Sequence, residues 1–162
     1  MTIQVAIQKA VKPTGELWLP AAREIRQWIR AALHGRCDSG QLTVRIVDRD
    51  ESAALNQTYR HKDGPTNVLS FPMDQPGLLD PPLLGDIVVC APLVMVEAAS
   101  QGKTAQAHWT HLVVHGALHL VGYDHVDPVA AEEMEAIEIS ILKALGWASP
   151  YEESGESRAN RL

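Results

Sequence analysis

Apolar and polar positions alternate in some segments of this chain and recur at helical spacing in others. Alternation is typical of a half-buried strand, and apolar residues three or four positions apart are typical of an amphipathic helix. On this basis we predict strands over residues 3–8, 42–46, 67–71 and 87–90. The helical spacing and the capping residues before it predict five helices, which begin near Pro20, Asp48, Pro92, Thr104 and Asp127.

The order of these elements predicts the fold class. Helices follow the first, second and fourth strands, and two further helices end the chain, which favours an α/β (α+β) fold: a small, mostly four-stranded mixed sheet covered by about five helices. We expect residues 1–148 to form this single domain. The segment 73–84 contains proline and glycine and no periodicity, and predicts a long loop. Residues 149–162 are polar and contain glycine and serine, and predict a disordered tail.

Several residues stand where they would cap a helix end. Asp48 and Glu51 have the spacing of a capping box, in which each side chain bonds the backbone of the first turn. Thr104 and Asp127 are expected N-caps, and Gly146 is expected to end the last helix.

The composition fits one globular protein in a reducing compartment. The chain has 162 residues, 46% of them hydrophobic, which is enough to bury a core. The apolar run 87–96 is too short to span a bilayer, and the first residues lack the pattern of a signal peptide. Cys37 and Cys90 are far apart, and Cys90 is expected to be buried, so we expect a cytoplasmic protein with no membrane contact. The net charge of -6 argues against broad, charge-driven binding of nucleic acid but leaves room for a local basic site.

Three histidines, His115, His119 and His125, form the most informative pattern in the chain. Residues four apart lie on one face of a helix, about 6 Å apart along its axis, so His115 and His119 can bind the same metal ion. Gly122 can end the helix in a left-handed turn and bring His125 back toward them. Three neutral nitrogen ligands with an open fourth position are what a catalytic zinc requires. We therefore predict one Zn²⁺ per chain at this helix end.

Two further histidines, His108 and His111, lie on the same helix stripe, within an arc of about 80°. His108 is about 10.5 Å from His115 along the axis, too far to share an ion, and is expected to be partly exposed and incidental. His111 could orient a ligand, contact substrate or be a buried polar residue, and we favour one of the last two roles.

The spacing H-x-x-x-H-x-x-G-x-x-H is that of the metzincin proteases. Those enzymes need a glutamate directly after the first histidine as general base, and here that position is Gly116. The metal frame is therefore present, while the usual proton acceptor of peptide hydrolysis is missing. Asp124 could act as a base, but capping the turn or orienting a histidine is the favoured interpretation.

Three blocks of the chain resemble the signature of the YbeY family. They are LNQTYRHKDGPTNVLSFP over residues 55–72, LGDIVVC over 84–90 and HLVVHGALHLVGYDH over 111–125. The blocks stand in the family's order and span most of residues 55–125. The family usually has aspartate where this chain has Asn67, and an acidic residue is common where it has His108. Neither change touches a predicted metal ligand.

The resemblance implies a cytoplasmic, zinc-dependent endoribonuclease specific for single-stranded RNA, with a four-stranded mixed sheet and several helices. It also implies roles in maturation of the 3′ end of 16S rRNA and in late quality control of 70S ribosomes. The implied partners are rRNA, ribosomal particles and ribosome-associated proteins. The arginine that matches Arg60 is considered functional in the family.

The residues fit such a role. Arg60 is a permanently charged planar fork suited to a phosphate, so we expect it to act catalytically by stabilising charge while zinc activates water or a ribose hydroxyl. The candidates for substrate binding are Lys62, Ser70 and His111. Arg60 and Lys62 could instead be a solvated helix end, and Ser70 could merely point outward.

Two other functions remain open. The first is a ribosome-assembly binding protein with a zinc site and little intrinsic nuclease activity. The second is a metallohydrolase for a small substrate or peptide, which Gly116 disfavours.

Overall fold

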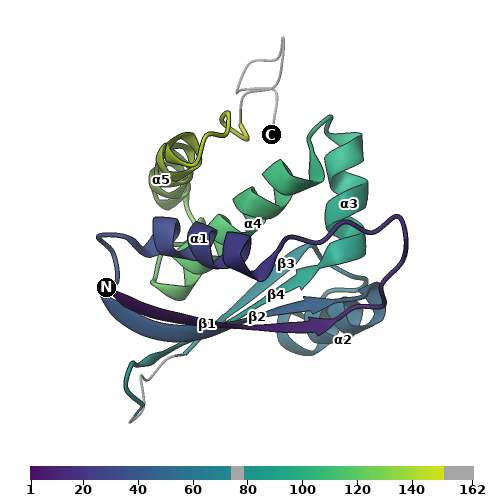
Figure 1. Cartoon of the computed structure of the whole chain (residues 1–162), viewed down its shortest axis with the longest axis horizontal. Coiled ribbons are helices and arrows are strands. Elements are labelled where there is room, and N and C mark those ends of the chain that lie inside the picture. Colours follow the sequence, from purple (N-terminus) through teal and green to yellow (C-terminus); the bar gives the residue numbers. More distant parts are fainter. Residues whose placement is uncertain (74–78, 152–162) are drawn as a thin grey trace.

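The computed structural model describes residues 1–73 and 79–151 (Figure 1). Strands and helices alternate as far as the third strand, the fourth strand follows the third directly, and three helices come after it in the described residues. In chain order the elements are Thr2–Ala10 (β1), Ala22–Leu33 (α1), Ser39–Val47 (β2), Arg49–Arg60 (α2), Val68–Pro72 (β3), Leu83–Cys90 (β4), Ala91–Ser100 (α3), Ala105–Leu120 (α4) and Pro128–Ala144 (α5). Each predicted strand and helix is present, but β4 begins at Leu83, within the predicted loop 73–84. Residues 74–78 of that predicted loop lie outside the described residues.

The four strands form one mixed sheet in the order β1-β2-β4-β3. β1 pairs with β2 and β2 with β4 in parallel, whereas β3 runs antiparallel to β4. β4 is therefore an inner strand, and its residues from Ile87 to Cys90 are all buried, as their unbroken apolar run predicts. The prediction of a small mixed sheet in a single α/β domain is confirmed.

Helices cover the two faces of the sheet unequally (Figure 1). α1 and α4 lie on one face, α5 packs against α4, and α2 lies on the opposite face. The larger core fills the space between the sheet and α1 and α4; among its fully buried side chains are Ile25, Ile29, Leu33, Val44, Ile87 and Leu118. The smaller core lies under α2 and consists of Val47, Leu69, Val88 and Cys90.

Two local predictions at helix starts are wrong. The first helix begins at Ala22, two residues after Pro20, because Glu24 Oε1 accepts a hydrogen bond from Ala21 N at 3.1 Å and fixes the start there. Asp48 does precede α2, but its Oδ2 accepts from Lys12 N at 3.1 Å instead of from the helix. The expected capping box with Glu51 therefore does not form.

Other helix ends follow the sequence. Thr104 Oγ1 accepts from Ala107 N at 3.1 Å, and Asp127 Oδ1 accepts from Ala130 N at 2.8 Å. Gly146 follows α5 with a left-handed φ of +93°. In residues 1–73 and 79–151, no helix is long and apolar enough to cross a membrane.

The chain continues as packed structure beyond the predicted domain boundary at residue 148. Ser149 is buried, and Lys103 Nζ donates to Pro150 O at 3.5 Å. Residues 149–151 thus belong to the folded part, and the rest of the predicted tail, 152–162, lies outside the described residues.

Candidate metal centre

The last two turns of α4 and the turn that follows bring three histidines together. His115 and His119 are on the helix, which ends with hydrogen bonds from Gly122 N to His119 O and from Tyr123 N to Leu118 O, at 3.2 and 3.1 Å. Gly122 has a φ of +102°, the left-handed conformation that glycine adopts without strain. The turn returns His125, whose ring centroid lies 5.4 Å from that of His115 and 5.1 Å from that of His119.

The three imidazoles fit a single metal ion. One nitrogen of each lies within 4.8 Å of the others, and this is the one such group found in the described residues. His115 Nε2 and His119 Nε2 are 3.1 Å apart. Two nitrogens on a tetrahedral zinc are about 3.3 Å apart, given zinc–nitrogen distances of about 2.0–2.1 Å. The donor set, three nitrogens and no sulfur, is that of an open catalytic site.

The environment of His119 favours the form that binds metal. The pKa of this imidazole is lowered from 6.5 to about 4. Burial of the ring is the main cause, and positive charge on His115 and His125 adds to it. Because a metal binds the neutral imidazole, protons compete weakly for this ligand position.

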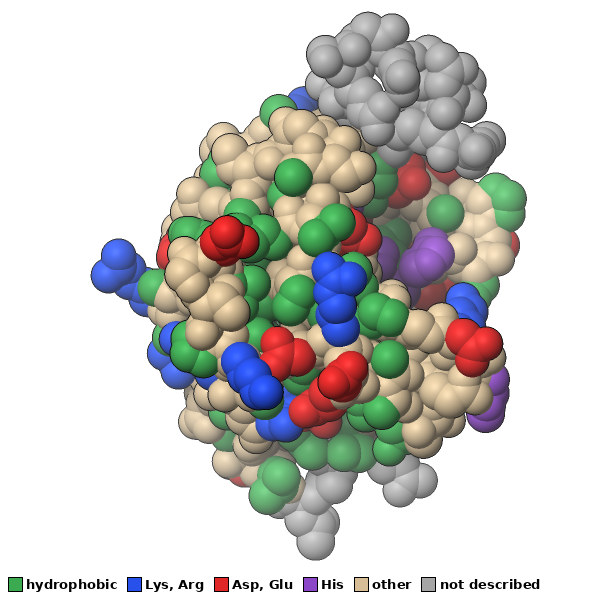
Figure 2. Space-filling model, turned by 90° about the vertical axis from the view of Figure 1, so that its right-hand side faces the viewer, with side chains coloured by type: hydrophobic (Ala, Val, Ile, Leu, Met, Phe, Trp, Pro, Cys, Tyr) green, Lys and Arg blue, Asp and Glu red, His purple; other side chains and the backbone are tan. Residues whose placement is uncertain are grey.

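The histidines form one wall of a hollow of about 480 Å³. Figure 2 shows histidine side chains within a recess of this surface. Other lining residues come from the end of α2, the loop after it and β3. Of the predicted site residues, the hollow is lined by Arg60, Lys62, Ser70, His115, His119 and His125.

Arg60 is held at the edge of this hollow by the sheet. It is the last residue of α2, and its Nη2 donates to the backbone oxygen of Ser70 on β3 at 3.3 Å. His61 then ends the helix with a left-handed φ of 56°, and Lys62 follows in the loop. Asn56 Nδ2 donates to Gly64 O at 2.9 Å and ties that loop to α2. Both cations therefore line the same hollow as the three histidines.

Ser70 links the sheet to the histidine helix. Its hydroxyl is buried and donates to Gly116 O at 3.2 Å. A Cβ on Gly116 would lie 2.9 Å from Ile87 Cγ2 and 3.2 Å from Ser70 Oγ. Because α4 packs this closely on the sheet, a glutamate at position 116 has no room. The structure thus explains the absence of the protease carboxylate.

A buried carboxylate, Glu138 on α5, lies behind the histidines. Its Oε1 is 2.5 Å from His115 Nδ1, its Oε2 is 3.3 Å from His111 Nε2, and the Tyr151 hydroxyl donates to Oε2. Burial alone would raise the pKa of Glu138, but the hydrogen bonds and charges of the two histidines outweigh it and lower the pKa to about 2. Glu138 is therefore an anion within the protein interior.

The other polar residues of the histidine helix and its turn lie apart from the hollow or at its rim. His111 faces Glu138 and does not line the hollow. His108, expected to be partly exposed, is buried, because α3 packs against α4 and Glu97 Oε1 lies 2.9 Å from His108 Nε2. Asp124 is exposed at the rim, where its Oδ1 accepts from Val126 N at 3.3 Å and supports the turn.

Comparison with known proteins agrees with the sequence signature. The profile of the family described as Endoribonuclease YbeY matches residues 16–146. The chain belongs to the YbeY endoribonuclease family. It is 49% identical over 154 residues to the "Endoribonuclease YbeY" of Nitrosococcus oceani, covering 94% of this chain and 99% of that one. It is 55% identical over 135 residues to that of Stutzerimonas stutzeri, covering 83% and 84%.

A solved structure supports the fold. The solution structure of a Thermotoga maritima protein superposes with a TM-score of 0.54 at 23% identity, covering 93% of this chain and 99% of the other. This likeness bears on the architecture of the sheet and helices alone.

Sequence reasoning missed Glu138, although a signal was present. The residue lies four positions after Met134 and three before Ile141, on the apolar stripe of α5. A glutamate in a stripe that packs against the core is rarely buried without a partner. Its partners are two histidines of the neighbouring helix and Tyr151, which the pattern within α5 cannot reveal.

Proposed function

We propose that this chain is a zinc-dependent endoribonuclease that cleaves single-stranded RNA in the cytoplasm. The observation that carries the proposal is that one hollow is lined both by the three histidines and by Arg60 and Lys62. A metal site and two cations in one hollow suit a phosphodiester, because the metal ion and the cations all attract its negative oxygens. The name of the curated relatives, endoribonuclease, supports the same chemistry.

The biological substrate we propose is rRNA. The family resemblance supports processing of the 3′ end of 16S rRNA and late quality control of 70S ribosomes, with ribosomal particles and ribosome-associated proteins as partners. The net charge of -6 is consistent with such a limited target, because this protein has no overall positive field for RNA in general.

His115, His119 and His125 would hold the zinc ion, since their nitrogens converge and no fourth protein ligand joins the group within the described residues. When bound, zinc supplies Lewis acidity toward a phosphoryl oxygen and activates the attacking oxygen.

Arg60 would stabilise the charge that develops on the phosphate. Its bond to Ser70 O uses one of the five N–H groups of the guanidinium and fixes the direction of the others. Lys62 would hold a neighbouring phosphate of the strand. Ser70 would contribute mainly through its backbone, since its hydroxyl hydrogen is directed to Gly116 O. His111 would act from behind the ligands, through Glu138, instead of touching RNA.

The test is cleavage of one defined RNA, offered as a single strand and as a duplex, by zinc-loaded protein. Arg60→Ala should retain zinc but lose about 10²–10³-fold in cleavage rate, the usual effect of removing a donor to developing negative charge. His115→Ala should lose zinc and cleavage together. Arg23→Ala, which removes an exposed arginine of α1, is the matched control and should cleave like the wild type.

The outcomes separate the candidate functions. Unchanged cleavage by Arg60→Ala contradicts the role of Arg60, and cleavage by zinc-free His115→Ala contradicts the metal-dependent route. Zinc binding without cleavage, combined with salt-sensitive binding to ribosomal particles, would favour the binding-protein alternative. Analysis of the product ends distinguishes attack by water from attack by a ribose hydroxyl.

A further inference from the structure

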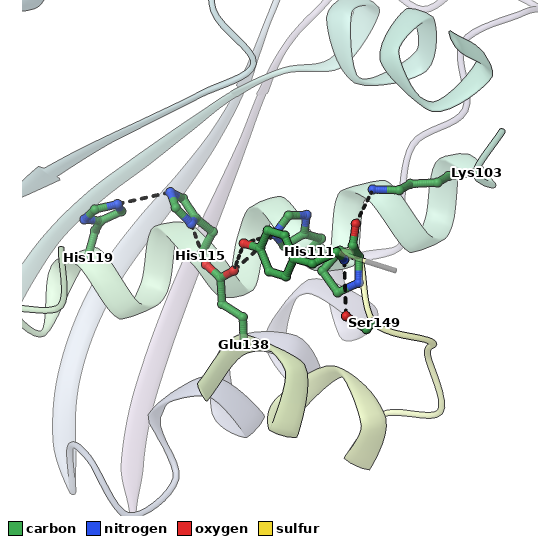
Figure 3. Close-up of polar contacts among 8 residues, drawn as sticks. Lys103, His111, His115, His119, Glu138 and Ser149 are labelled. Atoms are coloured by element: carbon green, nitrogen blue, oxygen red, sulfur yellow. Dashed lines mark hydrogen bonds and ion pairs between the residues drawn. The ribbon is translucent and has the colours of Figure 1, made fainter. Parts of the chain in front are cut away.

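The carboxylate of Glu138 is shared between three side chains from two other parts of the chain. Figure 3 shows Glu138 rising from α5 between His111 and His115 of α4. One oxygen, Oε1, lies 2.5 Å from His115 Nδ1. The other, Oε2, lies 3.3 Å from His111 Nε2 and accepts from the Tyr151 hydroxyl. Both oxygens are therefore engaged, and the side chain is held in one orientation.

The contact with Oε1 decides which nitrogen of His115 can bind a metal. An ionised carboxylate only accepts hydrogen bonds, so His115 Nδ1 carries the hydrogen in this pair. In a neutral imidazole the second nitrogen is then a free acceptor. That nitrogen, Nε2, points toward His119 Nε2, 3.1 Å away, at the site where the three histidines converge. Glu138 thus selects the tautomer of His115 and fixes the plane of its ring.

The segment after α5 fixes the Tyr151 ring against this pair. Trp147 N donates to Leu142 O at 2.8 Å, and Tyr151 N donates to Ser149 Oγ at 3.2 Å. Tyr151 packs edge-on against His111, with ring centroids 5.5 Å apart. Its hydroxyl donates to Glu138 Oε2, the carboxylate oxygen that does not bond His115.

We infer that Glu138 is a positioning residue for the metal ligand His115, and that Tyr151 holds Glu138 in place. The inference rests on the proposed metal site. A buried anion is costly unless hydrogen-bonding partners compensate for the lost water. The partners of both Glu138 oxygens are the ligand His115 and two residues beside it, His111 and Tyr151. Partners of this kind raise the basicity of a ligating histidine and keep its ring aligned. Residues 147–151, which follow α5, thereby support the metal centre.

Zinc affinity is the direct readout, because it is independent of cleavage. We expect Glu138→Gln, which keeps the shape and removes the charge, to bind zinc about 10–100-fold more weakly in competition with a chromophoric chelator. Tyr151→Phe should give a smaller loss of affinity. Glu97→Gln is the matched control, because it changes the other glutamate paired with an α4 histidine, His108, outside the metal cluster. Its zinc affinity should equal that of the wild type.

A second readout follows the tautomer itself. Nitrogen-15 NMR of zinc-free protein near pH 8, about 1.5 units above the ordinary histidine pKa, reports which ring nitrogen carries hydrogen. The wild type should show His115 protonated at Nδ1, and Glu138→Gln should show a mixture of both tautomers. A role limited to joining α5 to α4 would leave this signature unchanged. Circular dichroism of each zinc-free variant establishes that it is folded before either measurement.

The results separate this inference from the metal site on which it rests. If Glu138→Gln is folded and binds zinc as tightly as the wild type, while His115→Ala does not bind it, the positioning role is overturned and the metal site stands. If His115→Ala binds zinc like the wild type, both are overturned. Weaker zinc binding by Glu138→Gln in a protein that does not cleave RNA would support the positioning role and count against the proposed nuclease activity.

Discussion

The two ends of α4 use the same pair of residue types for different purposes. Near the start of the helix, His108 meets Glu97 of α3 at 2.9 Å, and near its end, His115 meets Glu138 of α5 at 2.5 Å. The side chain of His108 is 4% exposed and that of His115 is 24% exposed. A histidine–glutamate pair is therefore not itself a metal site.

The His115–Glu138 pair differs from the His108–Glu97 pair in the residues that surround it. The turn at Gly122 adds His125, and the hollow leaves one side of His115 open. At the first pair, α3 closes the corresponding side, and Asn67 Nδ2 also donates to Glu97 at 3.0 Å. The same interaction thus stabilises the fold at one end of the helix and, in our account, prepares a ligand at the other.

The largest expected effect comes from removing a ligand at the open end. His119→Ala should weaken zinc binding by more than about 100-fold, because losing a direct ligand costs more than losing an outer partner. The unfolding midpoint of the zinc-free protein should change little, since the ring is only partly buried. Competition titration and a denaturant melt measure the two quantities. Tight zinc binding by this variant would mean that the metal lies elsewhere.

The same substitution at the start of α4, where α3 covers His108, should lower stability and leave zinc affinity unchanged. His108→Ala removes a buried hydrogen-bonded ring and should lower the free energy of unfolding by about 1–3 kcal/mol. Zinc affinity of the folded variant should stay at the wild-type value. A loss of zinc binding without loss of stability would show that the two ends of α4 are not separate in function.

Close packing of the helix on the sheet gives a third test, of intermediate size. Gly116→Ala places a methyl group 2.9 Å from Ile87 Cγ2, which is too close without a shift of the strand or the helix. Overpacking of a core costs about 1–3 kcal/mol, and the gain in helix propensity offsets up to about 1 kcal/mol. We expect a net loss of about 1–2 kcal/mol in a thermal melt. A stabilised variant would contradict the packing described for Gly116.

The smallest expected effect lies at the first turn of the helix. Thr104→Ala removes the side chain that caps Ala107 N and should cost about 1 kcal/mol of stability. Zinc affinity should not change, because the cap is about three helical turns from the nearest ligand, His115. Thr104→Ser, which keeps the hydroxyl, should recover most of the loss in the same denaturant titration. No recovery would mean that the methyl group, and not the cap, carries the stability.

Much of the fold follows from local pattern. The positions of the strands and helices could be predicted because alternation and helical spacing are properties of single segments. The caps at Thr104 and Asp127 could be predicted for the same reason. The capping box at Asp48 could not be excluded, because its competitors, Lys12 and Arg45, come from remote parts of the chain: Lys12 N bonds Asp48, and Arg45 bonds Glu51 at 2.5 and 2.8 Å.

In the candidate site, too, some features follow from local sequence and others depend on contacts between distant segments. His115, His119 and His125 are close in sequence, so helix geometry sufficed to bring them together. Arg60 is held at the hollow by its hydrogen bond to Ser70 O on β3, a strand that pairs with β4. The family blocks suggested a functional role for Arg60, whereas residue spacing did not. The burial of His108 depends on contact between α3 and α4, which a single-segment pattern does not contain. Contacts between distant segments are the part that the sequence alone left undetermined.

The most direct test of the account is a crystal structure of zinc-loaded protein recorded at the zinc absorption edge. We predict one anomalous peak per chain among His115, His119 and His125, with three nitrogens at about 2.0–2.1 Å and a fourth ligand that is not from the protein. A peak beside His108 and Glu97, or an ion closed off by a fourth protein side chain, would contradict an open metal centre at the end of α4.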